Sequence, residues 1–228
     1  MMPIAGLYVI TDCVLRPDRS HVDIAKAALA GGARIVQLRD KTSPLSRVLE
    51  EGREIRRLTR EAGALFIVND RVDVAMALDA DGVHLGPDDF PPAEARRLLG
   101  AERLIGVSVS RVEEAEAALR DGASYLGVGA IFGTTTKADA GEPIGLERLK
   151  AIKRATPLPV VAIGGITRNN IRSVAEAGAD AAAVISAVLL AEDMVEATRA
   201  LAVEFGRSPS LRAPLTGPSL GVQDFLPR

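Results

Sequence analysis

The chain contains very few aromatic residues: 2 Tyr, 5 Phe and no Trp among its 228 residues. Proteins that bind single-stranded nucleic acid commonly stack bases on aromatic side chains, so this scarcity argues against such a function. An excess of charge of one sign is also absent, because 28 Lys and Arg residues face 30 Asp and Glu residues. Without a basic tail or patch, the sequence predicts no nucleic-acid partner and no binding to an anionic membrane surface.

Disulfide bonds within the chain are excluded, because Cys13 is its only cysteine. A reducing compartment, the cytoplasm, is therefore the expected location. No base is visible near Cys13, so we expect a small buried hydrophobic residue and not a nucleophile. No apolar run is long enough to span a bilayer. The apolar segment at residues 1–10 is short, has no basic residue at its beginning, and is interrupted soon afterwards by Asp12. These features predict a first strand and not a signal peptide.

Small aliphatic residues dominate what is present, in short apolar runs that alternate with segments of helical periodicity. The runs predict strands at 5–11, 33–38, 65–68, 82–85, 104–108, 124–128, 160–163 and 181–185. The periodic segments predict helices at 21–30, 44–62, 72–78, 91–100, 112–120, 146–155, 170–177 and 187–205. Eight such units favour an α/β fold, a single (β/α)8 TIM barrel over residues 1–206, with an open doubly wound sheet as the alternative. Residues 207–228, rich in Pro, Ser and Gly, predict a loosely ordered C-terminal tail.

Similar phrases recur where a helix ends and a strand begins, such as Arg-Asp-Gly-Ala-Ser and Glu-Ala-Gly-Ala-Asp. Glycine is favoured just after a helix end, and a turn of a few residues then leads into the strand. The recurrence therefore indicates a repeated structural junction and not a catalytic motif.

Three polar side chains follow the second expected strand, and barrels of this class carry their active sites at the C-terminal ends of the strands. Gln37, Arg39 and Lys41 are spaced by two and share one face of an extended segment, with Leu38 and Asp40 on the other face. We expect the three to point into the barrel mouth and bind an anion, because buried polar groups need partners. A salt-bridged barrel lining is the alternative.

Carboxylates follow the third and fourth expected strands. Asp70 follows the third, and Asp88 and Asp89 follow the fourth. Two carboxylates on adjacent strand ends suit Mg²⁺, which takes oxygen ligands and usually bridges to substrate phosphates. The candidate pair is Asp70 with Asp88 or Asp89. The alternative roles are a helix N-cap for Asp70 and a cap or turn before the Pro91–Pro92 pair for the other two.

His84 and Ser108 are further polar candidates near the mouth. His84 suits a general base or a ligand, or else a hydrogen-bonded residue of the barrel lining. Ser108 lies on the fifth expected strand, and no specific base for a nucleophilic role is visible beside it. We expect Ser110 to cap the next helix and His21, at a helix start, to be exposed.

Two other segments suit phosphate. Residues 129–137, GAIFGTTTK, combine glycines, three threonines and Lys137, and predict an anion-binding loop or else an ordinary polar turn. Gly165 and Ser186 follow the seventh and eighth expected strands, where barrels bind phosphate through backbone N–H groups; a tight turn is the alternative. A basic site with paired carboxylates and a site of backbone donors together predict two phosphorylated substrates and a diphosphate leaving group.

In their order and spacing these motifs resemble the thiamine-phosphate synthase family across about residues 5–190. The segments are YVITD at 8–12, QLRDK at 37–41, VND at 68–70, HLG at 84–86 with Asp89, GAIFGTTTK at 129–137 and AIGGI at 162–166. The resemblance implies a transferase of a pyrimidinylmethyl group with diphosphate as the leaving group. Its small-molecule substrates would be 4-amino-2-methyl-5-hydroxymethylpyrimidine diphosphate and 4-methyl-5-(2-phosphooxyethyl)thiazole. Its products would be thiamine monophosphate and diphosphate.

The resemblance also implies a role for each site residue. The pyrimidine diphosphate would be bound by Gln37, Arg39, Lys41, Asn69, Ser108 and Lys137, with Arg39, Lys41, Ser108 and Lys137 as the catalytic residues. Asp70 and Asp89 would hold Mg²⁺. The thiazole phosphate would be contacted by Thr134, Thr136, Gly165, Ile185 and Ser186. The place of residues 129–137 after the sixth expected strand, together with their glycines, predicts a mobile lid between the two anion sites. A homo-oligomer is left open.

Some positions depart from the family pattern. Pro87 replaces a Gln that is usual in the family, Ala130 and Gly133 replace common prolines, and Ser110 replaces a frequent His. A related thiazole tautomerase depends on a histidine near position 110, so Ser110 argues against that paralogue. A non-catalytic paralogue that binds a phosphorylated ligand is a second alternative, which the intact Asp70, Asp89 and Lys137 oppose. A phosphosugar isomerase on the same barrel would need an acid–base pair, for which His84 alone is an obvious candidate.

Overall fold

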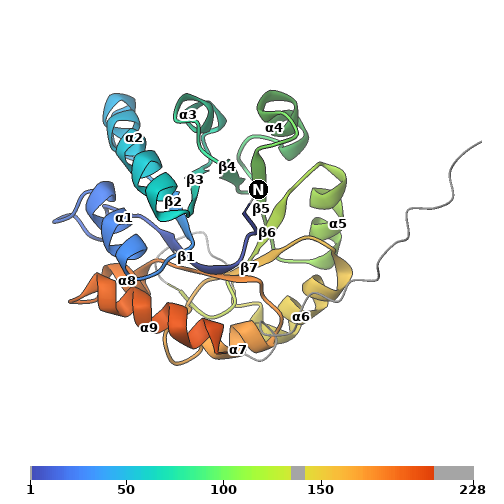
Figure 1. Cartoon of the computed structure of the whole chain (residues 1–228). Coiled ribbons are helices and arrows are strands. Elements are labelled where there is room, and N and C mark those ends of the chain that lie inside the picture. Colours follow the sequence, from blue (N-terminus) through green and yellow to red (C-terminus); the bar gives the residue numbers. More distant parts are fainter. Residues whose placement is uncertain (1, 135–141, 208–228) are drawn as a thin grey trace, which may run out of the picture.

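The computed structural model describes residues 2–134 and 142–207, and within them the chain folds into a closed parallel barrel surrounded by helices (Figure 1). The strands are β1 Gly6–Ile10, β2 Ile35–Leu38, β3 Leu65–Asn69, β4 Gly82–Leu85, β5 Leu104–Val109, β6 Tyr125–Val128, β7 Val160–Ile163 and β8 Ala181–Val184. The helices are α1 His21–Ala30, α2 Leu45–Ala62, α3 Val72–Ala77, α4 Pro92–Leu99, α5 Val112–Arg120, α6 Gly145–Ala155, α7 Ile171–Glu176, α8 Ser186–Leu189 and α9 Met194–Gly206. The predicted (β/α)8 barrel is confirmed. Thr136, Lys137 and the expected tail after Arg207 lie outside the described residues.

Closure of the barrel is decided by the pairing of its first and last strands. Tyr8 of β1 pairs with Ile35 of β2 on one side and with Ala183 of β8 on the other, all in parallel. An open doubly wound sheet would leave two strand edges unpaired. The open-sheet alternative is therefore wrong.

The strands are buried on both faces, which explains their continuous apolar runs. The side chains of β2, β3, β6 and β8 are buried along the whole strand. A parallel sheet covered by helices outside and filled by side chains inside leaves no wet face, so alternation of polar and apolar residues is lost. The few polar residues inside the barrel, such as Gln37, are therefore informative.

A polar residue just before each of three strands ties that strand to the preceding one. Asp81, before β4, accepts the N–H of Phe66 at 2.7 Å; Ser124, before β6, accepts that of Ile105 at 3.0 Å. Asp180, before β8, accepts the N–H of Val160 at 2.7 Å. The recurring Gly-Ala-Asp and Gly-Ala-Ser phrases thus supply acceptors for backbone donors at the N-terminal ends of the strands.

We expect Asp180→Ala to lower the free energy of unfolding by about 1–3 kcal/mol, because the N–H of the buried residue Val160 loses its acceptor. Lys153, whose Nζ lies 2.6 Å from the same carboxylate, loses its partner as well. Asp180→Asn retains an acceptor oxygen and should cost less. Urea unfolding of the three proteins measures this order, and equal stability of wild type and Asp180→Ala would contradict it.

The C-terminal helical segment differs from the prediction. In place of one helix at 187–205, the chain forms α8 and α9, separated at Leu190–Asp193. The Asp193 side chain accepts the N–H groups of Val195 and Glu196, at 2.9 and 3.0 Å, and so begins α9 as its N-cap. The apolar Leu190 and Ala191 continue the helical pattern and conceal this break in the sequence.

Candidate active site

The loops at the C-terminal ends of the strands surround a pocket of about 350 Å³ between the β2–α2 and β3–α3 loops. Four residues expected in the site line it: Lys41, Asn69, Asp70 and Asp89. Asn69 is the last residue of β3 and is buried. The structure therefore brings together residues from three different loops of the barrel mouth.

A second hollow, of about 490 Å³, lies at the opposite ends of α2 and α3, and we do not regard it as a candidate site. Two of its arginines are paired with carboxylates: Arg56 lies 2.8 Å from Asp81, and Arg60 pairs with Asp79. Catalytic residues of such barrels lie at the other end of the strands.

The three polar residues of the β2 segment each have a partner. Gln37 is buried, and its Nε2 donates to the Tyr8 hydroxyl at 2.6 Å. Arg39 pairs with Asp12, and Lys41 Nζ lies 3.1 Å from Asp70 Oδ2. Lys41 is 54% exposed, and its ammonium faces the mouth. Arg39 and Lys41 are thus salt-bridged, as expected for a salt-bridged barrel lining. Both nevertheless lie beyond the C-terminal end of β2, at the barrel mouth.

Asp89, and not Asp88, is the acid whose carboxyl contacts Asp70 and lines the mouth pocket with it. Asp70 takes a positive φ of 63°, which is uncommon for a residue other than glycine. Burial and contact with the Asp89 carboxyl raise the pKa of Asp70, while Lys41 opposes this shift. Neither acid caps a helix: Arg71 and Pro91 occupy the N-cap positions of α3 and α4. Asp89 also has a turn role, because its Oδ2 accepts the Gly86 N–H at 2.7 Å.

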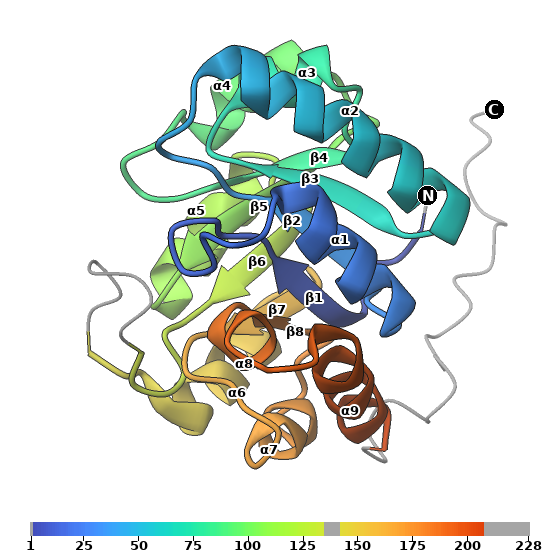
Figure 2. The same cartoon turned by 90° about the vertical axis from the view of Figure 1, so that its left-hand side faces the viewer.

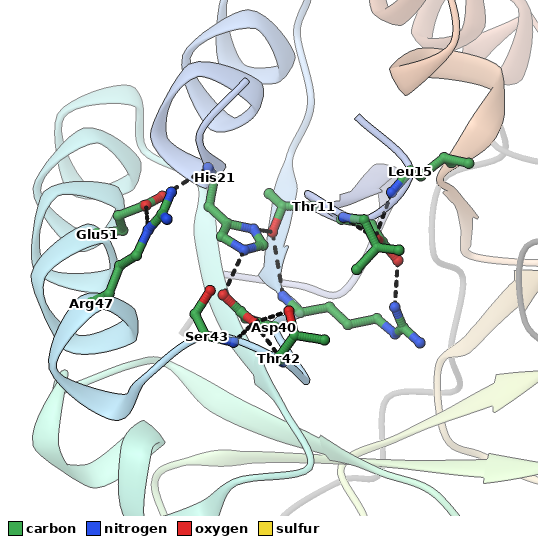
Figure 3. A network of polar contacts seen from close by, with 11 residues as sticks. Thr11, Leu15, His21, Asp40, Thr42, Ser43, Arg47 and Glu51 are labelled. Atoms are coloured by element: carbon green, nitrogen blue, oxygen red, sulfur yellow. Dashed lines mark hydrogen bonds and ion pairs between the residues drawn. The ribbon is translucent and has the colours of Figure 1, made fainter. Parts of the chain in front are cut away.

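His21 is buried, so the prediction that it is exposed is wrong. Its Nδ1 lies 2.7 Å from Thr11 Oγ1, and its Nε2 lies 3.1 Å from Asp40 Oδ2 (Figure 3). The His21 ring therefore joins the end of β1 to the loop after β2, and Figure 2 shows these two loops on the same side of the barrel. Its backbone N–H donates to Glu51 of α2 at 2.8 Å. Helix-start position alone does not reveal such burial.

Asp40 holds the loop between Arg39 and Lys41 in place. Burial alone would raise the pKa of Asp40, but hydrogen bonds from Ser43 and Thr42 outweigh it and lower that pKa. The Oδ1 atom accepts the N–H groups of Thr42 and Ser43 at 2.9 and 2.8 Å. Asp40 thus remains ionised and organises the turn that presents Lys41 to the mouth.

Cys13 packs against the core as predicted, but it is half-buried and not fully buried. Burial, together with the negative charges of Glu51 and Asp40, raises the pKa of Cys13 to about 12. Since the thiolate is the reactive form, a raised pKa lowers the reactivity of Cys13 below pH 12.

We expect native Cys13 to react with iodoacetamide at pH 8 at least ~100-fold more slowly than the urea-unfolded chain. Equal rates would contradict the buried thiol.

Ser108 has a histidine beside it, which the sequence interpretation missed. His84 Nε2 lies 3.0 Å from Ser108 Oγ, and His84 Nδ1 lies 3.1 Å from the Tyr125 hydroxyl. The pairing of β4 with β5 places His84 opposite Gly106, two residues before Ser108. No local sequence signal connects positions 24 residues apart; only the strand register does.

The loop after β7 packs against the loop after β6. Gly164 and Gly165 have positive φ values of 98° and 64°, and a Cβ on Gly165 would lie 2.7 Å from Phe132 Cβ. The Phe132 N–H donates to the Gly164 carbonyl at 3.0 Å. Within the described part of the chain, the Gly165 N–H donates to no protein acceptor. Thr134, the last described residue before the gap at 135–141, lies two residues beyond Phe132.

The other expected contacts of this second site lie at the end of β8. Ile185 is the N-cap residue of α8, and Ser186 is its first residue. Because α8 has only 4 residues, its dipole is weak, and any anion would be held by individual N–H groups. The prediction that Ser110 caps α5 is wrong, because Arg111 occupies the N-cap position. The Ser110 hydroxyl instead donates to Glu114 at 3.2 Å.

Comparisons with known proteins find relatives that match most of this chain. The family model described as thiamine monophosphate synthase matches residues 7–188. A thiamine-phosphate synthase of Chloroflexus aurantiacus is 55% identical over 195 residues, covering 86% of this chain and 90% of its own. One of Moorella thermoacetica is 52% identical over 200 residues, covering 88% and 95%. A solved thiamine phosphate pyrophosphorylase of Pyrococcus furiosus is 48% identical, with a TM-score of 0.81 and coverage of 88% and 95%.

These matches span nearly the whole barrel, from β1 to α8. They include the mouth loops that carry Lys41, Asp70 and Asp89. No helix among the described residues is long and apolar enough to cross a membrane. On these grounds the chain belongs to the thiamine monophosphate synthase family.

Proposed function

We propose that this chain joins 4-amino-2-methyl-5-hydroxymethylpyrimidine diphosphate to 4-methyl-5-(2-phosphooxyethyl)thiazole, giving thiamine monophosphate and diphosphate. Family membership and the names of its relatives support this activity. The observation that carries it is the juxtaposition of Lys41, Asp70 and Asp89 in one pocket at the barrel mouth. Such a cluster of cation and carboxylates suits a leaving diphosphate and its counterion.

The basic side of the mouth would bind the diphosphate. Lys41 Nζ is exposed there, and Arg39 approaches from the same strand end. Within the described residues, the buried Nε of Arg39 has no hydrogen-bond partner, so this guanidinium keeps a donor for another acceptor. Gln37, Asn69 and Ser108 would contact the pyrimidine part, and Lys137 would approach from the loop outside the described residues.

The paired carboxylates fit a magnesium ion. Asp70 and Asp89 are in contact, and this contact and burial raise the pKa of Asp70, so a divalent cation would relieve a like-charge repulsion. No group of three or more His, Cys, Asp or Glu side chains that could hold a metal occurs among the described residues. Mg²⁺ commonly takes one or two carboxylates and completes its shell with water and substrate phosphate. Bound there, it would neutralise charge on the leaving diphosphate.

The thiazole phosphate would bind on the other side of the mouth. The Gly165 N–H has no acceptor within the described residues, and Ile185 and Ser186 begin the short α8. Thr134, and Thr136 from outside the described residues, would add hydroxyl donors. Separate sites hold the two substrates so that the thiazole nitrogen meets the pyrimidine methylene carbon as its bond to the diphosphate oxygen breaks.

The test is to mix the purified full chain with both substrates, with and without Mg²⁺, and to measure thiamine monophosphate and diphosphate. We expect equal amounts of both products, formed only when Mg²⁺ is present. Tautomerisation of the carboxylated thiazole without thiamine monophosphate would replace this proposal by the tautomerase alternative. Binding of a phosphorylated substrate without turnover would replace it by the non-catalytic one.

A further inference from the structure

A chain of hydrogen-bonded side chains crosses the interior of the barrel and connects two of the proposed substrate contacts. It begins at Gln37 on β2, whose Nε2 lies 2.6 Å from the Tyr8 hydroxyl on β1. The Tyr8 and Tyr125 hydroxyls lie 3.3 Å apart. Tyr125, on β6, reaches His84 on β4 at 3.1 Å, and His84 reaches Ser108 on β5 at 3.0 Å. The two ends of this series of hydrogen bonds, Gln37 and Ser108, are thus residues expected to contact the pyrimidine.

The barrel leaves room for these rings by using glycines on two strands. A Cβ on Gly106 would collide with the Tyr125 ring, and it would lie 2.5 Å from His84 Nδ1. A Cβ on Gly127 would lie 2.6 Å from His84 Cε1. Glycine inside a strand commonly marks a close approach of another group. The His84 and Tyr125 rings are therefore fixed by packing, with centroids 5.5 Å apart.

The two tyrosines keep their protons. Both are fully buried, and burial raises the pKa of Tyr8 and of Tyr125 above the ordinary value. Each hydroxyl therefore has one proton that needs an acceptor, because a buried unsatisfied donor is costly. The Tyr8 hydroxyl accepts from the Gln37 amide, so its proton goes to the Tyr125 oxygen. The Tyr125 proton then goes to His84 Nδ1.

We infer that this proton order holds His84 as the neutral tautomer with hydrogen on Nε2, which donates to Ser108 Oγ. Tyr8, Tyr125 and His84 are then positioning residues, and Ser108 is the group that they orient. Since the Ser108 oxygen accepts from His84, its own proton points elsewhere and is available to an acceptor on the substrate. His84 does not act as a base that activates Ser108. This assignment rests on the proposed function only in naming the pyrimidine diphosphate as the recipient.

The first test needs no substrate and no variant. The chain has 2 histidines, so ¹⁵N-histidine labelling of the full protein gives two resolvable rings in long-range ¹H–¹⁵N NMR spectra. We expect the His84 ring to show an unprotonated Nδ1 and a protonated Nε2 near pH 8. The opposite tautomer, or a doubly protonated ring, would overturn the inference. Because this measurement is made without turnover, its result is independent of whether the proposed reaction is correct.

The second test compares two variants that each remove one buried hydroxyl. Tyr125→Phe removes the donor to His84 Nδ1, so the tautomers should mix and kcat should fall by about 10-fold or more. Tyr8→Phe leaves the Tyr125 hydroxyl donating its hydrogen bond to His84 Nδ1, so the tautomer with hydrogen on Nε2 should be retained. Its main effect should be a higher KM for the pyrimidine diphosphate, because Gln37 loses its acceptor.

The variants also distinguish orientation from packing. Both substitutions delete one oxygen from a fully buried ring, so a purely structural role predicts similar losses of stability and activity. A split, in which only Tyr125→Phe changes the His84 spectrum and kcat, supports the proton order. The same His84 spectrum in Tyr125→Phe and wild type would contradict it. His21 provides an internal reference in each spectrum, since it contacts Thr11 and Asp40 and none of the residues that link Gln37 to Ser108.

Discussion

Asp89→Asn is expected to reduce kcat for thiamine monophosphate formation by about 100-fold or more while the protein remains folded. The substitution removes one of the two adjacent carboxylates proposed to hold Mg²⁺. It keeps a side-chain oxygen that accepts the Gly86 N–H, so the turn after β4 should survive. The measurement is the initial rate over a range of Mg²⁺ concentrations, with circular dichroism to check the fold. We expect the variant to require more Mg²⁺ for half-maximal rate.

Asp88→Asn is the matched control, because it makes the same change of charge on the preceding, exposed residue. Asp88 does not line the mouth pocket. Its variant should retain activity within about two-fold of wild type, as expected of a surface substitution. If both variants lose activity equally, the loop after β4 as a whole is responsible, and Asp89 has no special role as a ligand.

Gly106→Ala is expected to lower the free energy of unfolding by about 1–3 kcal/mol and to reduce activity more than 10-fold. The added methyl group would occupy the space of the Tyr125 ring and of His84 Nδ1. Backbone of a closed barrel cannot retreat freely, since β5 is paired on both sides. Displacement of His84 would move Ser108 as well, through the 3.0 Å contact between them. Chemical unfolding and steady-state kinetics measure the two effects.

Gly206→Ala is the control for loss of glycine as such. Among the described residues, and apart from its chain neighbours and the backbone of its own helix, no atom lies within 4 Å of a Cβ placed on Gly206, at the end of α9. This variant should be neutral or slightly stabilising, because alanine has the higher helix propensity. Wild-type stability and activity in Gly106→Ala would show that the barrel interior is looser than the contacts of Tyr125 and His84 indicate.

Most of the fold was predictable because its signals are local. The strands are short apolar runs and the helices are amphipathic, so β4 and β7 begin and end at the predicted residues. The split between α8 and α9 was missed because Leu190 and Ala191 continue the apolar pattern. The signal for α9 was Asp193, a good N-cap residue three positions before Glu196.

The candidate site was predictable where a single segment contains the information. The spacing of Gln37, Arg39 and Lys41 predicted one shared face, but β2 ends at Leu38, and Lys41 lines the mouth pocket together with Leu38 and Asp40. The salt-bridge partners could be identified only from the structure. Lys41 pairs with Asp70, 29 residues away in the sequence, and Arg39 pairs with Asp12, 27 residues away. Such contacts depend on strand order and register, which periodicity does not contain.

The sequence by itself determined the class of fold, the end of the barrel that carries the site, and the family. Each follows from local patterns: hydrophobic period, turn residues and short motifs in a fixed order. Tertiary structure alone decided that the barrel closes, that Asp89 and not Asp88 meets Asp70, and that His21 is buried. It also placed His84 between Tyr125 and Ser108. The physical reason is that proton order, ion pairing and burial depend on which side chains meet in space, and closure of eight strands brings together residues distant in the chain.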